Sequence, residues 1–206
     1  MSATGSKYEK LCQEISGYGK VMVAYSGGVD STLLLRVALD CLGRDNVLAV
    51  TSQSPLTHEL DITAARETAR ALGAHHRIIT VNKLENENIA SNPANRCYYC
   101  KLHLYTLLEQ LARQEGYSVI IEGSNVSDLG DYRPGFEALK QFNLVRSPLL
   151  SGGFDKAEVR QLARQLGLSN WNRPSNACLA SRFPYGERLT AEKLAAVSRA
   201  ETELAA

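Results

Sequence analysis

A short glycine-containing loop carries the most specific chemical signal in this sequence. It lies between a hydrophobic run and a helical pattern and reads Ser26-Gly27-Gly28-Val29-Asp30-Ser31. Two glycines let the backbone turn tightly, and the helix N-terminus behind them adds partial positive charge, which together favour phosphate oxygens. We therefore call residues 26–31 the phosphate loop. We expect Ser31 to cap the helix and Asp30 to hold a metal ion that bridges phosphates.

Three of the cysteines lie in polar segments and could together bind one metal centre. Cys97 and Cys100 stand three positions apart, flanked by Arg96 and Lys101, and Cys178 lies far along the chain. The flanking cations favour thiolate forms. Three thiolates with no evident fourth protein ligand suit a four-iron cluster with one open iron, which could carry a sulfide for transfer. The structural alternative is three free cysteines, with the pair placed at a helix start.

The remaining cysteines and the histidines show no comparable arrangement. Cys12 and Cys41 fall in helical patterns, and we interpret both as small core residues. The histidines have no metal-binding spacing with the cysteines and are interpreted as ordinary surface or helix residues: His58, His75, His76 and His103. The sequence has five cysteines, an odd number, and its N-terminus has no apolar leader segment. Both features argue against a disulfide framework, and we expect a cytoplasmic location.

Short β-branched runs alternate with longer helical patterns, which predicts an α/β fold with a Rossmann-like parallel sheet flanked by helices. Strands are expected at residues 21–25, 47–51, 77–81 and 118–121. Helices are expected at residues 7–16, 33–42, 60–72, 104–116, 159–166 and 191–206. Long polar loops are expected at residues 82–100, 122–135 and 169–188. Ligands of open α/β sheets bind beyond the carboxyl ends of the strands, so the loops after the first and fourth strands should form the site.

Composition excludes several classes of protein. The 206 residues carry a net charge of +1, so no whole-chain field would draw the protein to nucleic acid or to an anionic membrane. The longest apolar run, residues 21–25, is too short to span a bilayer. An apolar fraction of 44% with 22% charged residues is ordinary for a globular domain.

The phosphate loop after a hydrophobic strand resembles the PP-loop of the N-type ATP pyrophosphatases, which have an adenine nucleotide alpha hydrolase-like fold. This resemblance implies that the protein uses ATP and Mg²⁺, adenylates a carboxyl or carbonyl oxygen and releases pyrophosphate. It also implies that the loop residues bind the nucleotide and that Ser52, at the end of the second strand, contacts adenosine. The loop lacks the Lys of a Walker A motif, which argues against ordinary γ-phosphoryl transfer.

Four further segments resemble the LarE-type ATP-dependent sulfur transferases, which act in synthesis of the nickel-pincer nucleotide cofactor of lactate racemase. The segments are residues 92–97, 122–128, 131–135 and 177–187. One branch of this family sacrifices the sulfur of a single cysteine at the position of Cys178 and is left with dehydroalanine. Another branch has three cysteines and is associated with an iron–sulfur cluster. With Cys97, Cys100 and Cys178, this sequence resembles the second branch.

The family resemblance implies a pyridinium dicarboxylate mononucleotide as the small-molecule substrate, one carboxylate of which becomes a thiocarboxylate. Cys178, Asp30 and Arg182 are then the expected catalytic residues, and Arg133 is expected to bind phosphate or carboxylate oxygens. For both arginines, a surface salt bridge is the alternative. The resemblance further implies a homo-oligomer and partners that deliver sulfur or insert nickel.

The same resemblance predicts the division of the chain. Residues 1–188 should form the ATP pyrophosphatase domain with the cysteine-bearing loops. Residues 189–206 should begin a C-terminal helical, substrate-binding segment that is truncated here.

Three other functions remain open from the sequence. A tRNA-thiolating PP-loop enzyme would need a basic RNA-binding surface, which the net charge does not favour. An ammonia-using synthetase would have no need for three cysteines in loops. A nucleotide-binding scaffold with a structural zinc ion would need a fourth ligand, and none is evident.

Overall fold

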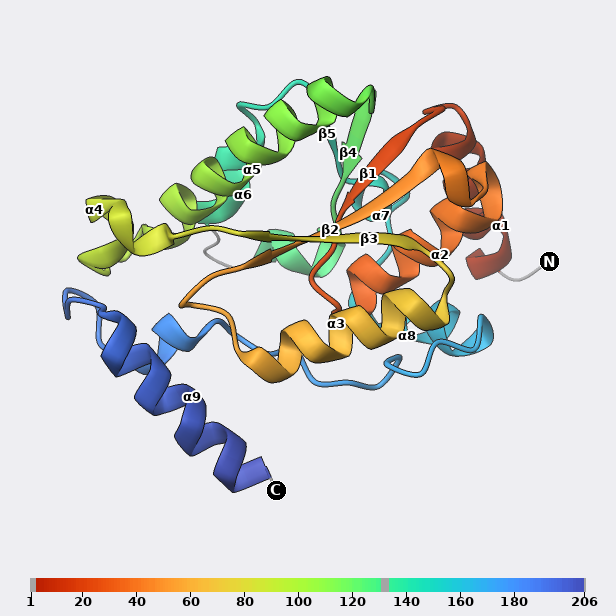
Figure 1. Ribbon diagram of the computed structural model, residues 1–206. Helices are drawn as coiled ribbons and strands as arrows, with labels where there is room; N and C mark the ends of the chain where they lie inside the picture. The colour runs from red at the N-terminus through yellow and green to blue at the C-terminus, as the bar shows by residue number, and fades with distance from the viewer. Residues whose placement is uncertain (1–2, 131–133, 206) are drawn as a thin grey trace.

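The expected α/β fold is confirmed. The computed structural model describes residues 3–130 and 134–205 (Figure 1). In this part of the chain one sheet has the strand order β3-β2-β1-β4-β5, and the paired strands all run parallel. The strands are β1 (Val21–Ala24), β2 (Val47–Gln53), β3 (His75–Thr80), β4 (Val119–Ile121) and β5 (Val145–Arg146).

Helices cover both faces of the sheet (Figure 1). One face carries α1 (Ala3–Ser16), α2 (Val29–Leu42), α3 (Glu59–Ala71) and α8 (Lys156–Gln165). The other face carries α5 (Arg96–Glu115) and α6 (Pro134–Leu139). Shorter helices are α4 (Glu87–Ala90), α7 (Pro148–Ser151), η1 (Arg44–Asn46), η2 (Lys83–Glu85), η3 (Val126–Gly130) and η4 (Leu179–Arg182).

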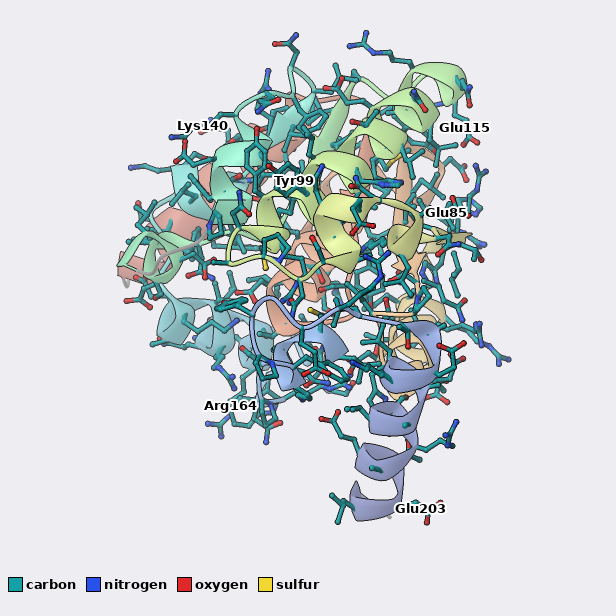
Figure 2. The ribbon with its side chains drawn as sticks, turned by 90° about the vertical axis from the view of Figure 1, so that its left-hand side faces the viewer. Glu85, Tyr99, Glu115, Lys140, Arg164 and Glu203 are labelled. Atoms are coloured by element: carbon teal, nitrogen blue, oxygen red, sulfur yellow. The ribbon has the colours of Figure 1, made fainter. Side chains whose placement is uncertain are left out.

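The last helix, α9 (Ala191–Ala205), extends away from the body of the molecule, with Glu203 near its far end (Figure 2). Across the described ranges, none of the helices combines the length and the apolar character needed to cross a membrane.

Side chains of the central strand β1 alternate between the two faces of the sheet, so that a layer of helices packs on each face. Val21 and Val23 of β1 face the core shared with α1, α2 and α8, whereas Met22 faces the core shared with α5. Successive side chains of a strand point to opposite faces of the sheet. Because both faces are covered, β1 is apolar throughout, as expected for a buried parallel strand.

Two parts of the expected layout differ in the structure. β5 was not expected, because two residues are too few to show a strand pattern. The stretch 82–100 was expected to be a loop, but it contains α4 and the start of α5, which begins at Arg96. Cys97 and Cys100 therefore lie within the first five residues of a helix. Tertiary packing stabilises this helix start, since Tyr99 and Cys100 pack against a buried cluster that includes Leu56.

Strand order determines where the loops meet. The chain leaves β1 toward β2 and β3 on one side, and it returns to β4 on the other side of β1. The carboxyl ends of β1 and β4 are therefore neighbours at a topological switch point. Gly123, just after β4, packs so closely that an added Cβ would lie 3.0 Å from the Cβ of Asp30. The loops after the first and fourth strands thus meet, as the sequence predicts.

We expect Leu34→Ala to lower the free energy of unfolding by about 2–5 kcal/mol, because it leaves a cavity in the core beneath α2. Leu34 is 0% exposed. Leu204→Ala provides the matched control, because Leu204 is 89% exposed and its truncation should change stability by less than about 0.5 kcal/mol. Urea denaturation followed by circular dichroism measures both variants. Equal midpoints would contradict this packing.

Candidate active site

The phosphate loop is a tight turn held by its own serines. The Oγ of Ser31 lies 3.1 Å from that of Ser26 and donates to the carbonyl of Gly28 at 3.1 Å. The first helical bond runs from Thr32 N to Gly28 O at 2.9 Å. Backbone N–H groups of a first helical turn have no partner inside the helix, so those of α2 are available to an anionic ligand.

Ser31 does not cap α2, contrary to expectation. Gly28 is the N-cap residue, and its cap makes no side-chain hydrogen bond. Ser31 lies inside the first turn, where its hydroxyl bonds back to the loop instead. Gly27 has a positive φ of 77°, and an added Cβ there would approach that of Ala65 to 2.8 Å. This glycine is needed both for its backbone conformation and for the close contact with α3.

A cavity of about 510 Å³ opens beyond the carboxyl ends of the strands. Its walls are the phosphate loop, the end of β2, the start of α3, one side of α5 and residues 173–178. This volume is within the range of small-molecule sites. The side chain of Ser52 lines it, and the Ser52 hydroxyl is buried without a hydrogen-bond partner. An unsatisfied buried hydroxyl at the predicted adenosine position is consistent with a polar ligand there.

Asp30 lies where three segments meet. One carboxylate oxygen accepts a hydrogen bond from Asn125 Nδ2 at 3.0 Å, and the other pairs with the ammonium of Lys156. These partners come from the loop after β4 and from the first turn of α8. Mg²⁺ is usually bound by one or two carboxylates together with substrate phosphates. One carboxylate beside the phosphate loop fits an ion that arrives with ATP.

Two of the three candidate cysteines reach this cavity. Cys100 and Cys178 line it, whereas Cys97 is exposed and does not. Among the described residues, no group of three or more Cys, His, Asp and Glu side chains is arranged to hold a metal ion. The donor types suit a cluster, but the three thiols are not gathered into one site among these residues.

A buried arginine connects the cysteine-bearing segments. Arg96 is 4% exposed and donates to Asn92 Oδ1, to the carbonyl of Ala180 at 3.3 Å and toward the Sγ of Cys178 at 3.8 Å. Asn92 has a φ of 53°, unusual for a residue other than glycine, and its amide donates to Pro184 O at 2.8 Å. These bonds hold the segment after Cys178 against the start of α5.

A second tether holds the segment before Cys178. Asp61 of α3 accepts hydrogen bonds from Arg173 at 2.8 Å and from Asn176 at 3.0 Å. Asp61, Arg173 and Asn176 all line the cavity. The segment that carries Cys178 is therefore fixed on both sides, by Arg96 after the cysteine and by Asp61 before it.

The two arginines expected at the site are placed differently. Arg182 is not among the cavity-lining residues. Its guanidinium pairs with Glu201 of α9 at 2.5 Å and donates to Asn176 Oδ1 at 3.3 Å. The hydrogen bond to Glu201 raises the pKa of Arg182, and the same bond lowers the pKa of the Glu201 carboxyl. Arg133 lies outside the described residues.

Two histidines are more buried than the sequence indicates, and both make hydrogen bonds. His58 is buried, lines the cavity and caps α3 by accepting from Leu60 N at 3.2 Å. His76 lies 2.8 Å from the Thr51 hydroxyl, and burial lowers its pKa. Cys12 and Cys41, by contrast, pack against the core as expected. The interpretation of His58 as an ordinary surface or helix residue was therefore wrong.

Sequence reasoning missed most of the residues that hold the site together. Asn125 lies inside a segment that resembles the sulfur transferases, but no role was assigned to it. Asp155 and Glu158 form a capping box at the start of α8, and Lys156 lies between them. The capping-box pattern in the sequence is therefore a signal that places Lys156 in the first turn of a helix. Asp61 and Arg173 have no local signal, because their pairing joins residues far apart in the chain.

Comparison with known proteins connects this architecture to a family. The NAD synthase family model matches residues 8–93, which include the phosphate loop. An uncharacterized protein of Synechocystis sp. is 45% identical over 97% of this chain and 74% of its own length. The pyridinium-3,5-bisthiocarboxylic acid mononucleotide synthase of Lactiplantibacillus plantarum is 39% identical over 99% of this chain and 74% of its own length.

A probable tRNA sulfurtransferase of Methanothermobacter thermautotrophicus is a more distant relative, 28% identical over 72% of this chain and 40% of its own length. The match to the L. plantarum synthase spans nearly all of this chain, from the phosphate loop to the segment that carries Cys178. The chain therefore belongs to the LarE family of ATP-dependent sulfur transferases, with the nucleotide-binding domain of the PP-loop enzymes.

Proposed function

We propose that this protein adenylates a carboxylate of pyridinium-3,5-dicarboxylic acid mononucleotide and converts it to a thiocarboxylate. The observation that carries the proposal is that one cavity is lined by both the phosphate loop and Cys178. An anion-binding loop alone would support any use of ATP, and a thiol alone would support many reactions. The name of the L. plantarum relative supports the identity of the product.

The first step joins the substrate to AMP. A carboxylate oxygen attacks the α-phosphorus of ATP, the bond to the β-phosphate oxygen breaks, and pyrophosphate leaves. Backbone N–H groups at the start of α2 and the ammonium of Lys156 stabilise the charge on the departing group. Asp30 holds the Mg²⁺ that ATP brings, and Ser52 bonds to the adenosine. The product is an acyl-adenylate, whose carbonyl carbon has a good leaving group.

The second step transfers sulfur. The thiolate of Cys178 attacks the acyl carbon, AMP leaves, and the substrate is bound to Cys178 as a thioester. Loss of the Cys178 Cα proton and cleavage of its Cβ–S bond then release the thiocarboxylate and leave dehydroalanine. Arg96 and Asp61 orient the segment that carries the thiol, and Arg182 acts through Asn176 rather than on the substrate.

A four-iron cluster held by Cys97, Cys100 and Cys178 is the second candidate for the sulfur source. Its support is that all three thiols are free and that Arg96 joins the first turn of α5 to Cys178. The cluster would supply hydrosulfide on its open iron, and Cys178 would then be retained. Binding it would require the three thiols to be brought together, because they are not gathered among the described residues.

The remaining expectations about partners follow from the family. We propose a homo-oligomer that receives sulfur from a delivery protein and passes its product toward nickel insertion. A tRNA substrate is less favoured, because the net charge is +1 and the match to the tRNA sulfurtransferase covers 40% of that relative.

We expect Asp30→Asn to slow substrate-dependent pyrophosphate release by about 100-fold, because the variant cannot hold the charge-neutralising ion. Asp40→Asn is the control on the same helix, since Asp40 pairs with Arg36 at 2.7 Å on the exposed side of α2. A coupled pyrophosphate assay measures both variants, and thermal unfolding checks that they fold. A normal rate in Asp30→Asn would remove the ion-holding role.

Changing Cys178 to Ser should abolish the thiolated product while pyrophosphate release continues, because a hydroxyl has no sulfur to give. Wild-type protein should become lighter by one H₂S after a single turnover, as measured by intact mass spectrometry. Cys41→Ser is the control, because burial raises the pKa of the Cys41 thiol to about 11 and keeps it protonated. Product formed without a change in mass would rule out the sacrificial route.

The cluster hypothesis has its own test. Anaerobic reconstitution should give about four iron and four sulfide ions per chain, with visible absorbance that Cys97→Ser, Cys100→Ser and Cys178→Ser each abolish. Unchanged absorbance in all three variants would refute shared ligation. One zinc ion per chain would instead favour a structural site.

A further inference from the structure

Lys83 is a buried lysine that the mechanism above does not use. It is the first residue of η2, directly beyond the edge strand β3, and is 8% exposed. Its side chain lines the same cavity as the phosphate loop and Cys178. Figure 2 shows the side of the molecule on which Glu85 of η2 and Tyr99 of α5 lie. Lysine is rarely buried to this extent unless it is paired.

Both carboxylates of the cavity wall already form ion pairs with other residues of the wall. Of the described residues that line it, the carboxylates are Asp30 and Asp61, which pair with Lys156 and Arg173. Across residues 3–130 and 134–205, the Lys83 ammonium has no hydrogen-bond or ion-pair partner, although its backbone groups are bonded. The wall therefore has one cation more than its own carboxylates neutralise.

The Lys83 ammonium opens into the cavity and is not sealed inside the protein, because the fully enclosed side-chain N and O atoms without a partner among the described residues are Ser52 Oγ and Asn170 Oδ1. Water in the cavity solvates this ammonium when no ligand is bound. A ligand that displaces the water must replace its hydration with negative charge or hydrogen-bond acceptors. The ligand that Lys83 requires is therefore an anion that enters the cavity.

The position of Lys83 indicates which anion this is. β2 lies between β3 and β1, so Lys83 is about 10 Å along the sheet edge from the phosphate loop. The phosphate loop already has its own cation in Lys156. The neighbour of Lys83, Leu84, instead packs in the cluster that includes Cys100 and Leu179, the residue after Cys178. Lys83 thus belongs to the end of the cavity where sulfur is delivered.

We propose that Lys83 binds a carboxylate of the acceptor nucleotide and so forms the acceptor subsite at the cysteine end of the cavity. This inference rests on the proposed function and adds a residue that recognises the substrate. A pyridinium dicarboxylate has two carboxylates, so one can pair with Lys83 while the other is presented to the α-phosphate. The pairing would fix which carboxylate reacts in a given binding orientation.

The test compares Lys83→Met with wild type. Methionine retains the length and volume of the side chain and removes its charge. Isothermal calorimetry should show a dissociation constant for pyridinium-3,5-dicarboxylic acid mononucleotide raised by about 10- to 100-fold, the loss expected for one hydrogen bond to a charged group. The KM for the mononucleotide should rise with it, while binding of Mg-ATP stays within about twofold. Lys83→Arg, which keeps the charge, should recover part of the affinity.

A stability measurement gives a readout that is independent of activity. Without ligand, Lys83→Met should melt at the same temperature as wild type or higher, because it removes an unmatched charge. Lys10→Met is the control, since Lys10 is exposed on α1 and the variant loses the same charge. It should bind the mononucleotide as wild type does.

Three outcomes would overturn the assignment. If Lys83→Met binds the mononucleotide as tightly as wild type, the acceptor subsite is elsewhere, while the proposed function stands. If it loses Mg-ATP instead, Lys83 belongs to the triphosphate end. If wild type and Lys10→Met neither bind nor convert the mononucleotide, the proposed function itself fails, and the acceptor assignment fails with it.

Discussion

The buried guanidinium of Arg96 holds together the segments on which the candidate site depends. It lies in the first turn of α5, yet its hydrogen bonds reach Asn92, Ala180 and the thiol of Cys178. A buried cation needs several acceptors, and here they come from the segment before α5 and from the segment that carries Cys178. These bonds hold Cys178 beside the start of α5, although 82 positions separate Arg96 from Cys178.

The charged side chains around the cavity are unevenly distributed. At the phosphate loop, Asp30 and Lys156 face each other beside the start of α2, an arrangement suited to a metal-bound triphosphate. Lys83 also lines the cavity, and its neighbour Leu84 packs against the cluster that includes Leu179. Burial raises the pKa of Tyr25, which also lines the cavity, so its phenol adds no negative charge there.

The placement of the cysteines bears on how sulfur reaches the substrate. Cys178 lines the cavity from a segment tethered on both sides, whereas Cys97 is exposed and is not among the lining residues. Direct attack by Cys178 needs no rearrangement of the pair on α5. A cluster on all three thiols would need the thiols to be brought together, because no such group is gathered among the described residues.

Periodicity and local motifs determined the α/β fold, most of the strands and the phosphate loop, because each depends on neighbouring residues. The tertiary structure decided which distant side chains meet. Arg96 with Cys178, Asp61 with Arg173, and Lys156 with Asp30 join residues between 82 and 126 positions apart, and no local pattern records such pairs. It also decided that Lys83 lines the cavity beside Cys178, because that cavity is built from segments that are far apart in the chain.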